Sequence, residues 1–192
     1  MKKEQNLLVV ISAPSGAGKT TLCQKLLADY STKLTLSISS TTRAPRGKER
    51  HGVDYFFLSR EEFESQIQEN RFLEWAQVHD NYYGTSRAMV EKAFQAGKSV
   101  LLDIDVQGAE QLRNSLPEQC LSIFIAPPSL EELEARLIAR GTDKLEVIQK
   151  RMIRAKVEME EQHRFSSVIV NRELEQAYAE LKIILESKLR SK

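Results

Sequence analysis

A glycine-rich loop between an apolar strand pattern and a helical pattern constrains the fold of this chain more than any other feature. Residues 7–11 are all apolar, and Leu22, Leu26 and Leu27 repeat at helical spacing within residues 21–30. The loop between these segments contains Ala13, Pro14, Ser15, Gly16, Ala17, Gly18, Lys19, Thr20 and Thr21. A strand, this loop and a helix in succession predict a phosphate-binding loop.

Such a loop binds a nucleoside triphosphate through groups with separate roles. Its backbone N–H groups converge on the phosphates, and Lys19 adds positive charge near the β- and γ-phosphates. The hydroxyl of Thr20 is then placed to ligate Mg²⁺. The general pattern has glycine where this chain has Ala13, so we expect the backbone of Ala13 to avoid positive φ. The alternative is an ordinary turn, which this combination of features disfavours.

The composition indicates one globular domain and argues against several kinds of partner. The chain has 192 residues, 41% of them hydrophobic, and its 28 basic residues balance 27 acidic ones. This balance argues against nucleic acid or a membrane as a partner. Cys23 and Cys120 match neither a zinc site nor a disulfide framework, so reduced thiols and a cytoplasmic location are expected. The composition leaves open whether the protein forms a homo-oligomer.

Further apolar runs alternate with helical patterns along the rest of the chain. Runs typical of strands buried in a parallel sheet occupy residues 100–104, 121–125 and 168–170. Ser129 and Glu132 form a helix-start pattern, and Gly141 ends that helix. Helical spacing continues over residues 145–159 and 174–185. The alternation predicts an α/β fold with a doubly wound parallel sheet.

Residues 34–98 interrupt that alternation and carry a cluster suited to a phosphate group. Arg43 and Arg46 can grip one phosphate with bidentate forks, and Tyr55 and Tyr83 add phenolic donors. The cluster fits a monophosphate; the alternative is a basic turn that faces water. The same segment contains a strand-like piece at residues 55–58 and a capping box of Ser59 and Glu62.

Several motifs, in this order, closely resemble the guanylate kinase family. They lie at residues 13–19, 40–46, 72–76, 81–86 and 102–108, and the resemblance extends from about residue 8 to the C-terminal helix. It implies transfer of the γ-phosphoryl group of ATP to GMP, which gives ADP and GDP. It also implies an approximate division into a P-loop core (residues 1–33, 99–128 and 164–192), an inserted GMP-binding lobe (34–98) and a helical lid (129–163).

The resemblance implies an acceptor site within that lobe. Residues that would hold the GMP phosphate or its surroundings are Ser39, Arg43, Arg46, Tyr55 and Tyr83. Glu74 would accept from guanine N1–H and N2–H₂, with Thr85, Asp103 and Asp105 nearby. The chemistry of Glu74 supports this role, because adenine has an acceptor at N1 and would leave a buried carboxylate unpaired. A glutamate that points to water is the alternative.

On the donor side, the resemblance implies a lid whose arginines fold over ATP. Arg140 and Arg151 match the lid positions best, Arg136 is close enough to assist, and Asn171 matches a position near adenine. The expected catalytic residues are Lys19, Arg43, Arg140 and Arg151, and the expected Mg²⁺ contacts are Thr20 and Asp103. Without the upstream motifs, an exposed helix with Glu–Arg pairs would explain these arginines. Lobe and lid are expected to close separately when both substrates bind.

Two other functions stay open at this point. One is a guanylate-kinase-like interaction module without catalysis, which the presence of Lys19, Glu74 and Asp103 disfavours. The other is a P-loop kinase for a different monophosphate, because the phosphate-binding loop does not specify the acceptor.

Overall fold

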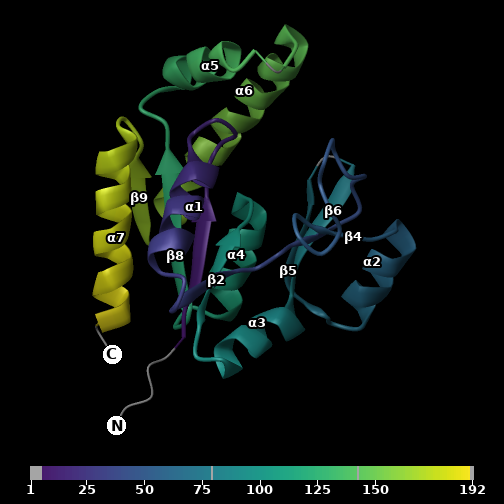
Figure 1. Ribbon diagram of the computed structural model, residues 1–192. Helices are drawn as coiled ribbons and strands as arrows, with labels where there is room; N and C mark the ends of the chain where they lie inside the picture. The colour runs from purple at the N-terminus through teal and green to yellow at the C-terminus, as the bar shows by residue number, and fades with distance from the viewer. Residues whose placement is uncertain (1–5, 79, 142, 191–192) are drawn as a thin grey trace.

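A five-stranded parallel sheet forms the centre of the molecule (Figure 1). The computed structural model describes residues 6–78, 80–141 and 143–190. The strands are β1 (Leu8–Ser12), β2 (Leu34–Leu36), β7 (Ser99–Asp103), β8 (Cys120–Ala126) and β9 (Ser167–Val170), in the order β2-β7-β1-β8-β9. Each neighbouring pair is parallel. The predicted strands correspond to β1, β7, β8 and β9, so the predicted parallel α/β core is confirmed.

Apolar side chains of β1 alternate between two layers of helices. Val9 and Ile11 pack with α1 (Lys19–Asp29) and α7 (Leu174–Arg190), while Leu8 and Val10 face α3 (Arg87–Gln95) and α4 (Val106–Ser115). All of β1 is buried. Burial on both faces explains why the strand reads as a continuous apolar run.

A second, smaller sheet lies to one side of the core (Figure 1). Its strands are β3 (Ser40–Thr41), β4 (Phe56–Phe57), β5 (Phe72–Val78) and β6 (Asn81–Ser86), in the order β4-β3-β6-β5, and α2 (Arg60–Gln68) accompanies them. Phe63 on α2 is fully buried and stacks on Phe72, with 4.4 Å between the ring centroids. The small sheet therefore has an apolar centre of its own.

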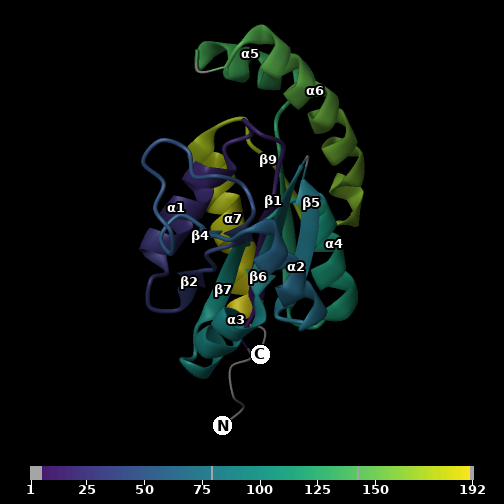
Figure 2. The same cartoon turned by 90° about the vertical axis from the view of Figure 1, so that its right-hand side faces the viewer.

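The chain between β8 and β9 forms a separate helical projection, which extends beyond the end of the main sheet (Figure 2). It consists of α5 (Leu130–Ala139), α6 (Leu145–Glu160) and the 3-10 helix η1 (Glu161–Arg164). Leu133, Leu137, Ile148 and Ala155 join the two long helices in an apolar cluster. Because β8 and β9 are parallel neighbours, the projection leaves the carboxyl end of β8 and returns to the amino end of β9.

The structure refines several sequence-based predictions. Residues 34–36, placed by the sequence at the start of the inserted lobe, pair with β7 in the main sheet. Ser59 and Glu62 form the predicted capping box of α2. Ser129 caps α5, but the Glu132 carboxylate binds Arg136 instead of completing a box. Helix α4 follows β7 as the predicted alternation requires, whereas α3 has no counterpart among the predictions.

Both cysteines are free, as predicted. Burial raises the pKa of Cys23 to about 12 and that of Cys120 to about 11, so both remain protonated thiols. Within residues 6–78, 80–141 and 143–190, none of the helices has the length and apolar character that a membrane crossing requires.

Candidate active site

The carboxyl ends of three adjacent strands bring the candidate residues together. The phosphate-binding loop follows β1, Asp103 ends β7, and the helical projection follows β8. These strands lie side by side in the order β7-β1-β8. Ligands of open parallel sheets bind at this edge, so the fold places the loop where a nucleotide is expected.

The phosphate-binding loop depends on two glycines with left-handed backbone. Gly16 has φ 102° and Gly18 has φ 94°, values that other residues adopt only at a cost. Gly16 also packs against Leu133 and Leu137 of α5, each 3.0 Å from the position of a Cβ. In the part of the chain that the structure describes, Asn70 is the one non-glycine residue with positive φ, so the expectation for Ala13 is met.

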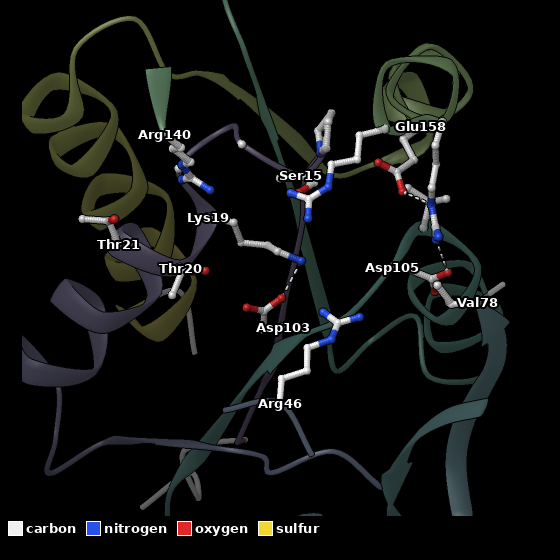
Figure 3. A pocket seen from close by; sticks show the side chains of 17 residues that line it. Ser15, Lys19, Thr20, Thr21, Arg46, Val78, Asp103, Asp105, Arg140 and Glu158 are labelled. Atoms are coloured by element: carbon white, nitrogen blue, oxygen red, sulfur yellow. Dashed lines mark hydrogen bonds and ion pairs between the residues drawn. The ribbon is translucent and has the colours of Figure 1, made fainter. Parts of the chain in front are cut away.

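Lys19 and Asp103 form an ion pair across the mouth of this loop (Figure 3). Burial disfavours the charge of Lys19, but the Asp103 carboxylate outweighs that effect and raises the pKa of Lys19. Lys19 is therefore held as a cation at the first turn of α1. Its charge is available for a phosphate that displaces or joins the carboxylate.

The loop opens into a cavity of about 430 Å³, which we call the donor cavity. Figure 3 shows Lys19, Arg46 and Arg140 directed into it from different elements. Its lining residues are Ala13, Pro14, Ser15, Gly16, Gly18, Lys19, Thr20, Thr21, Arg46, Val78, Asp103, Asp105, Val106, Arg140, Arg151, Arg154 and Glu158. Such a concentration of cations around backbone N–H groups suits a polyphosphate.

The three arginines proposed for the lid occupy different positions. Arg151 donates from Nη1 to Ser15 Oγ over 3.2 Å and from Nη2 to Asp143 Oδ1 over 3.2 Å. Arg140 is exposed at the edge of the donor cavity. Arg136 does not line it; its guanidinium binds Glu132 on the same helix and the carbonyl oxygen of Asn171.

The buried side chain of Asn171 supports the phosphate-binding loop. Asn171 Nδ2 donates to the Ala17 carbonyl oxygen over 2.7 Å. It lies 2.3 Å from the position that a Cβ on Gly18 would occupy. Asn171 therefore contacts the loop backbone directly, and Ala17 itself is turned into the core.

A second cavity, of about 170 Å³, adjoins the first and is called the acceptor cavity here. It shares Lys19, Val78, Asp103 and Asp105 with the donor cavity. The remaining lining residues are Ser39, Tyr55, Glu74, Ala76, Tyr83, Gly84 and Ile104. The structure thus joins two ligand spaces at the Lys19–Asp103 pair.

Glu74 lies in the wall of the acceptor cavity with only 4% of its surface exposed. Thr85 Oγ1 donates to Glu74 Oε1 over 2.5 Å. Burial raises the pKa of Glu74 to about 7, and the negative charge of Asp105 acts in the same direction. Its other oxygen, Oε2, lies against Gly108 of α4, where a Cβ would stand 2.2 Å away.

Asp105 connects the two cavities to helix α4 and to the lid. Its Oδ1 accepts from the Gly108 N–H over 3.0 Å and caps α4. Its Oδ2 lies 3.6 Å from Arg154 Nη2, and Arg154 Nε donates to Glu158 Oε1 over 2.8 Å. Figure 3 shows Asp105 and Glu158 near each other on one side of the donor cavity.

The two arginines proposed to grip the acceptor phosphate do not converge. The Arg43 fork binds the Glu49 carboxylate in a bidentate manner, at 2.9 and 3.0 Å, and Arg46 lines the donor cavity. The hydrogen bonds with Glu49 raise the pKa of Arg43, and Arg43 lowers that of Glu49. The ring of Tyr55 lies 5.2 Å from the Arg43 guanidinium.

The oxygen ligands near the phosphate-binding loop suit a metal carried by phosphates. Among the described residues, no three His, Cys, Asp or Glu side chains form a metal-binding group. Thr20 and Asp103 line the donor cavity together, and Mg²⁺ is commonly held by one or two such groups plus phosphate oxygens. The residues present fit that mode.

The three histidines lie outside this arrangement or outside the described residues. His51 contacts Phe56, and His163 contacts the Glu160 carbonyl. His79 lies outside the described residues.

The sequence-based prediction assigns no role to several residues of the site. They are Glu49, Gly108, Arg154 and Glu158, which act on Arg43, Glu74 and Asp105 through contacts distant in sequence. Arg154 follows Arg151 by three residues on α6, so helical spacing was the available signal for it. The others leave no comparable pattern.

Taken with the fold, the adjoining cavities define a P-loop kinase with a donor site and an acceptor site. A model of the guanylate kinase family matches residues 5–188. The guanylate kinase of Haemophilus ducreyi is 52% identical over 93% of this chain and 86% of its own length, and that of Bacillus subtilis is 49% identical over 95% and 89%. The chain belongs to the guanylate kinase family.

Solved structures agree with this assignment. The crystal structure of guanylate kinase from Anaplasma phagocytophilum has a TM-score of 0.80 and 34% identity, over 98% of this chain and 88% of that one. The SH3-kinase fragment of tight junction protein 3 has a TM-score of 0.52 and 16% identity, over 97% of this chain and 58% of that fragment, and shows the fold alone. The resemblance inferred from the sequence, and with it the assignment as an ATP:GMP phosphotransferase, is confirmed.

Proposed function

We propose that this chain transfers the γ-phosphoryl group of ATP to GMP by aligning the two nucleotides across the Lys19–Asp103 pair. The observation that carries the proposal is the junction of the donor and acceptor cavities at these two residues. A direct transfer needs donor and acceptor oxygens in line, with positive charge around the moving group.

In the acceptor cavity, Glu74 selects guanine. Its Oε1 already accepts from Thr85, and the ionised carboxylate has further lone pairs for guanine N1–H and N2–H₂. Adenine offers no such pair of donors, and an unpaired buried acceptor costs about 1–3 kcal/mol. Ser39 lines the same wall, and the neighbouring Asp105 is placed to accept from the base edge.

The phosphate of GMP is held by Tyr55, Tyr83 and Arg43 on the acceptor side and by Arg46 from the donor side. Tyr55 and Tyr83 line the acceptor cavity, with 6.2 Å between their ring centroids. Arg43 is preorganised as a planar fork by Glu49, and the GMP phosphate takes over or shares that fork. Arg46 approaches from the donor side and bridges the two phosphate groups.

In the donor cavity, the loop backbone and Lys19 bind the ATP phosphates. Arg140 and Arg151 add charge that is complementary to the transferring group. Thr20 and Asp103 would hold Mg²⁺, which supplies charge neutralisation between the β- and γ-phosphates. Asn171 keeps the Ala17 carbonyl in place and so fixes the loop that receives ATP.

We also propose that the inserted lobe and the lid each move as a unit and close separately on the core. The lobe contains the small sheet, and the lid has its own apolar cluster, so each is able to move without unfolding. Closure would exclude water from the γ-phosphate and prevent ATP hydrolysis.

A cytoplasmic location is supported by the two free cysteines. Oligomeric state and the exclusion of nucleic acid remain predictions from the sequence.

Steady-state phosphorylation of a nucleoside monophosphate panel with Mg-ATP tests the proposal. GMP should be the preferred acceptor, and Arg151→Met should lower kcat by about 10³-fold or more, because a charge-stabilising arginine is lost. Phosphorylation of AMP or a pyrimidine monophosphate in preference to GMP would overturn the assignment of the acceptor. Binding of GMP without any turnover would favour the interaction module instead.

A further inference from the structure

The lid helix α6 contacts the rest of the protein at two points that belong to different ligand sites. Arg151 reaches Ser15 of the phosphate-binding loop, and three residues later Arg154 reaches Asp105. Side chains three residues apart lie on the same face of a helix. A single rigid element therefore extends from the donor loop to the wall of the acceptor cavity.

On the acceptor side, the contact of Arg154 leads directly to the base-reading residue. Asp105 lines both cavities and caps α4 through the Gly108 N–H. Gly108 in turn lies against the Glu74 carboxylate. Three packed steps thus connect Glu74 with α6, and each is a direct contact.

The guanidinium of Arg154 is held from two directions. Glu158, one helical turn ahead, fixes Nε at 2.8 Å, which leaves Nη2 directed at Asp105 over 3.6 Å. The side chains of Arg154 and Asp105 are 28% and 16% exposed. Partial shielding makes this pair stronger than a fully solvated one.

A second ion pair joins the same two segments outside the cavities and provides a comparison. Arg164 of η1 lies 2.9 Å from Glu110 of α4, and both side chains are 47% exposed. It ties the end of the lid to α4, but neither residue lines the donor or the acceptor cavity. Its loss should affect the general attachment of η1 and nothing specific to either ligand.

We propose that Arg154 is a positioning residue that couples occupation of the acceptor cavity to the position of the lid. This inference rests on the proposed function. GMP orders Glu74 and Asp105, Asp105 holds Arg154, and α6 then presents Arg151 to the transferring phosphoryl group. By linkage, a triphosphate in the donor cavity strengthens GMP binding by the same factor.

Calorimetric titration of the full chain measures this factor directly. GMP is titrated with and without a saturating β,γ-imido analogue of ATP, using wild type, Arg154→Met, Arg154→Lys and the matched control Arg164→Met. In the wild type, the analogue should tighten GMP binding about fivefold or more. The factor should fall toward one in Arg154→Met, recover in part in Arg154→Lys, and stay unchanged in Arg164→Met.

Results that contradict the coupling role differ from those that contradict the proposed function. A wild-type factor of one, an unchanged factor in Arg154→Met, or an equal loss in Arg164→Met would each overturn the coupling role. Weaker binding of GMP alone with the factor intact would likewise overturn it, because Arg154 would then only support Asp105. If Arg154→Met does not fold, Glu158→Gln and Arg154→Lys carry the test. Failure of the wild type to bind GMP would instead refute the proposed function.

Discussion

The carboxylate of Glu74 lies directly against the backbone of Gly108, and no side chain fits between them. Helix α4 thereby supports the Glu74 carboxylate from one side. Because Asp105 caps this helix one turn earlier, the position of Glu74 is set by α4 as well as by Thr85. The raised pKa of Glu74 follows from this enclosed position, and the proposed selectivity for guanine depends on it.

Gly108→Ala should displace Glu74 and weaken recognition of GMP. The new Cβ would overlap Glu74 Oε2, and a misplacement of about 1 Å at such a site costs about a hundredfold in rate. We expect kcat/KM for GMP to fall by that order while the KM for ATP changes little. Asn114→Ala, exposed on the same helix, is the control. Wild-type efficiency in Gly108→Ala would contradict the contact.

Glu74→Gln should reduce selectivity and remove a pH dependence. The wild-type carboxylate has a pKa of about 7, and only its ionised form accepts two bonds from guanine. GMP binding to wild type should therefore weaken as the pH falls from about 8 to about 6. In Glu74→Gln, we expect kcat/KM for GMP to be at least about tenfold lower and the dependence to be flat. An unchanged preference for GMP over AMP would refute the role of Glu74.

The same substitution should stabilise the fold at high pH. The folded pKa of Glu74, about 7, exceeds the ordinary 4.5, so the folded state binds the proton more tightly and loses stability as the pH rises between these values. Above that window, the penalty is on the order of 3 kcal/mol. Thermal unfolding of Glu74→Gln should occur several degrees higher than wild type at about pH 8 and at a similar temperature at about pH 4.

An exposed glutamate provides the comparison for this stability effect. Glu91→Gln on α3 removes a carboxylate that faces water and should leave the unfolding temperature unchanged at both pH values. Equal stabilisation by both substitutions would mean that burial of Glu74 is not the cause.

Asn171→Ala should weaken ATP binding through the phosphate-binding loop. The substitution removes the donor to the buried Ala17 carbonyl, at a cost of about 1–3 kcal/mol. We expect the KM for ATP to rise about tenfold, while the dissociation constant for GMP stays at the wild-type value. Asn171→Asp places an acceptor opposite the carbonyl and should be at least as harmful. Equal losses for both nucleotides would indicate a general folding defect.

Local patterns explain which parts were predictable from the sequence. The loop around Lys19 and the four buried strands depend on short-range spacing and continuous apolar runs. The strand β2 is too short to show a hydrophobic period. Its place beside β7 is set by pairing between segments that are far apart in the sequence. The residue types of the site were likewise readable, because phosphate and guanine demand particular donors and acceptors.

Contacts between distant side chains account for the rest. No spacing rule links Arg43 with Glu49 rather than with a ligand, or Asn171 with the Ala17 carbonyl. These partners are selected by tertiary packing, which also turned Arg136 away from the donor cavity. The sequence thus indicated which groups line the two cavities more accurately than it indicated their resting partners.

The lid occupies the crossover from the carboxyl end of β8 to the amino end of its parallel neighbour β9, and its helices share an apolar cluster. A segment attached in this way is suited to exchange as a cassette, so chimeras with relatives should keep the parent sheet intact. The junction imposes one condition. Leu133 and Leu137 pack against Gly16. A transplanted lid must therefore carry side chains of similar size at these positions to keep the phosphate-binding loop covered.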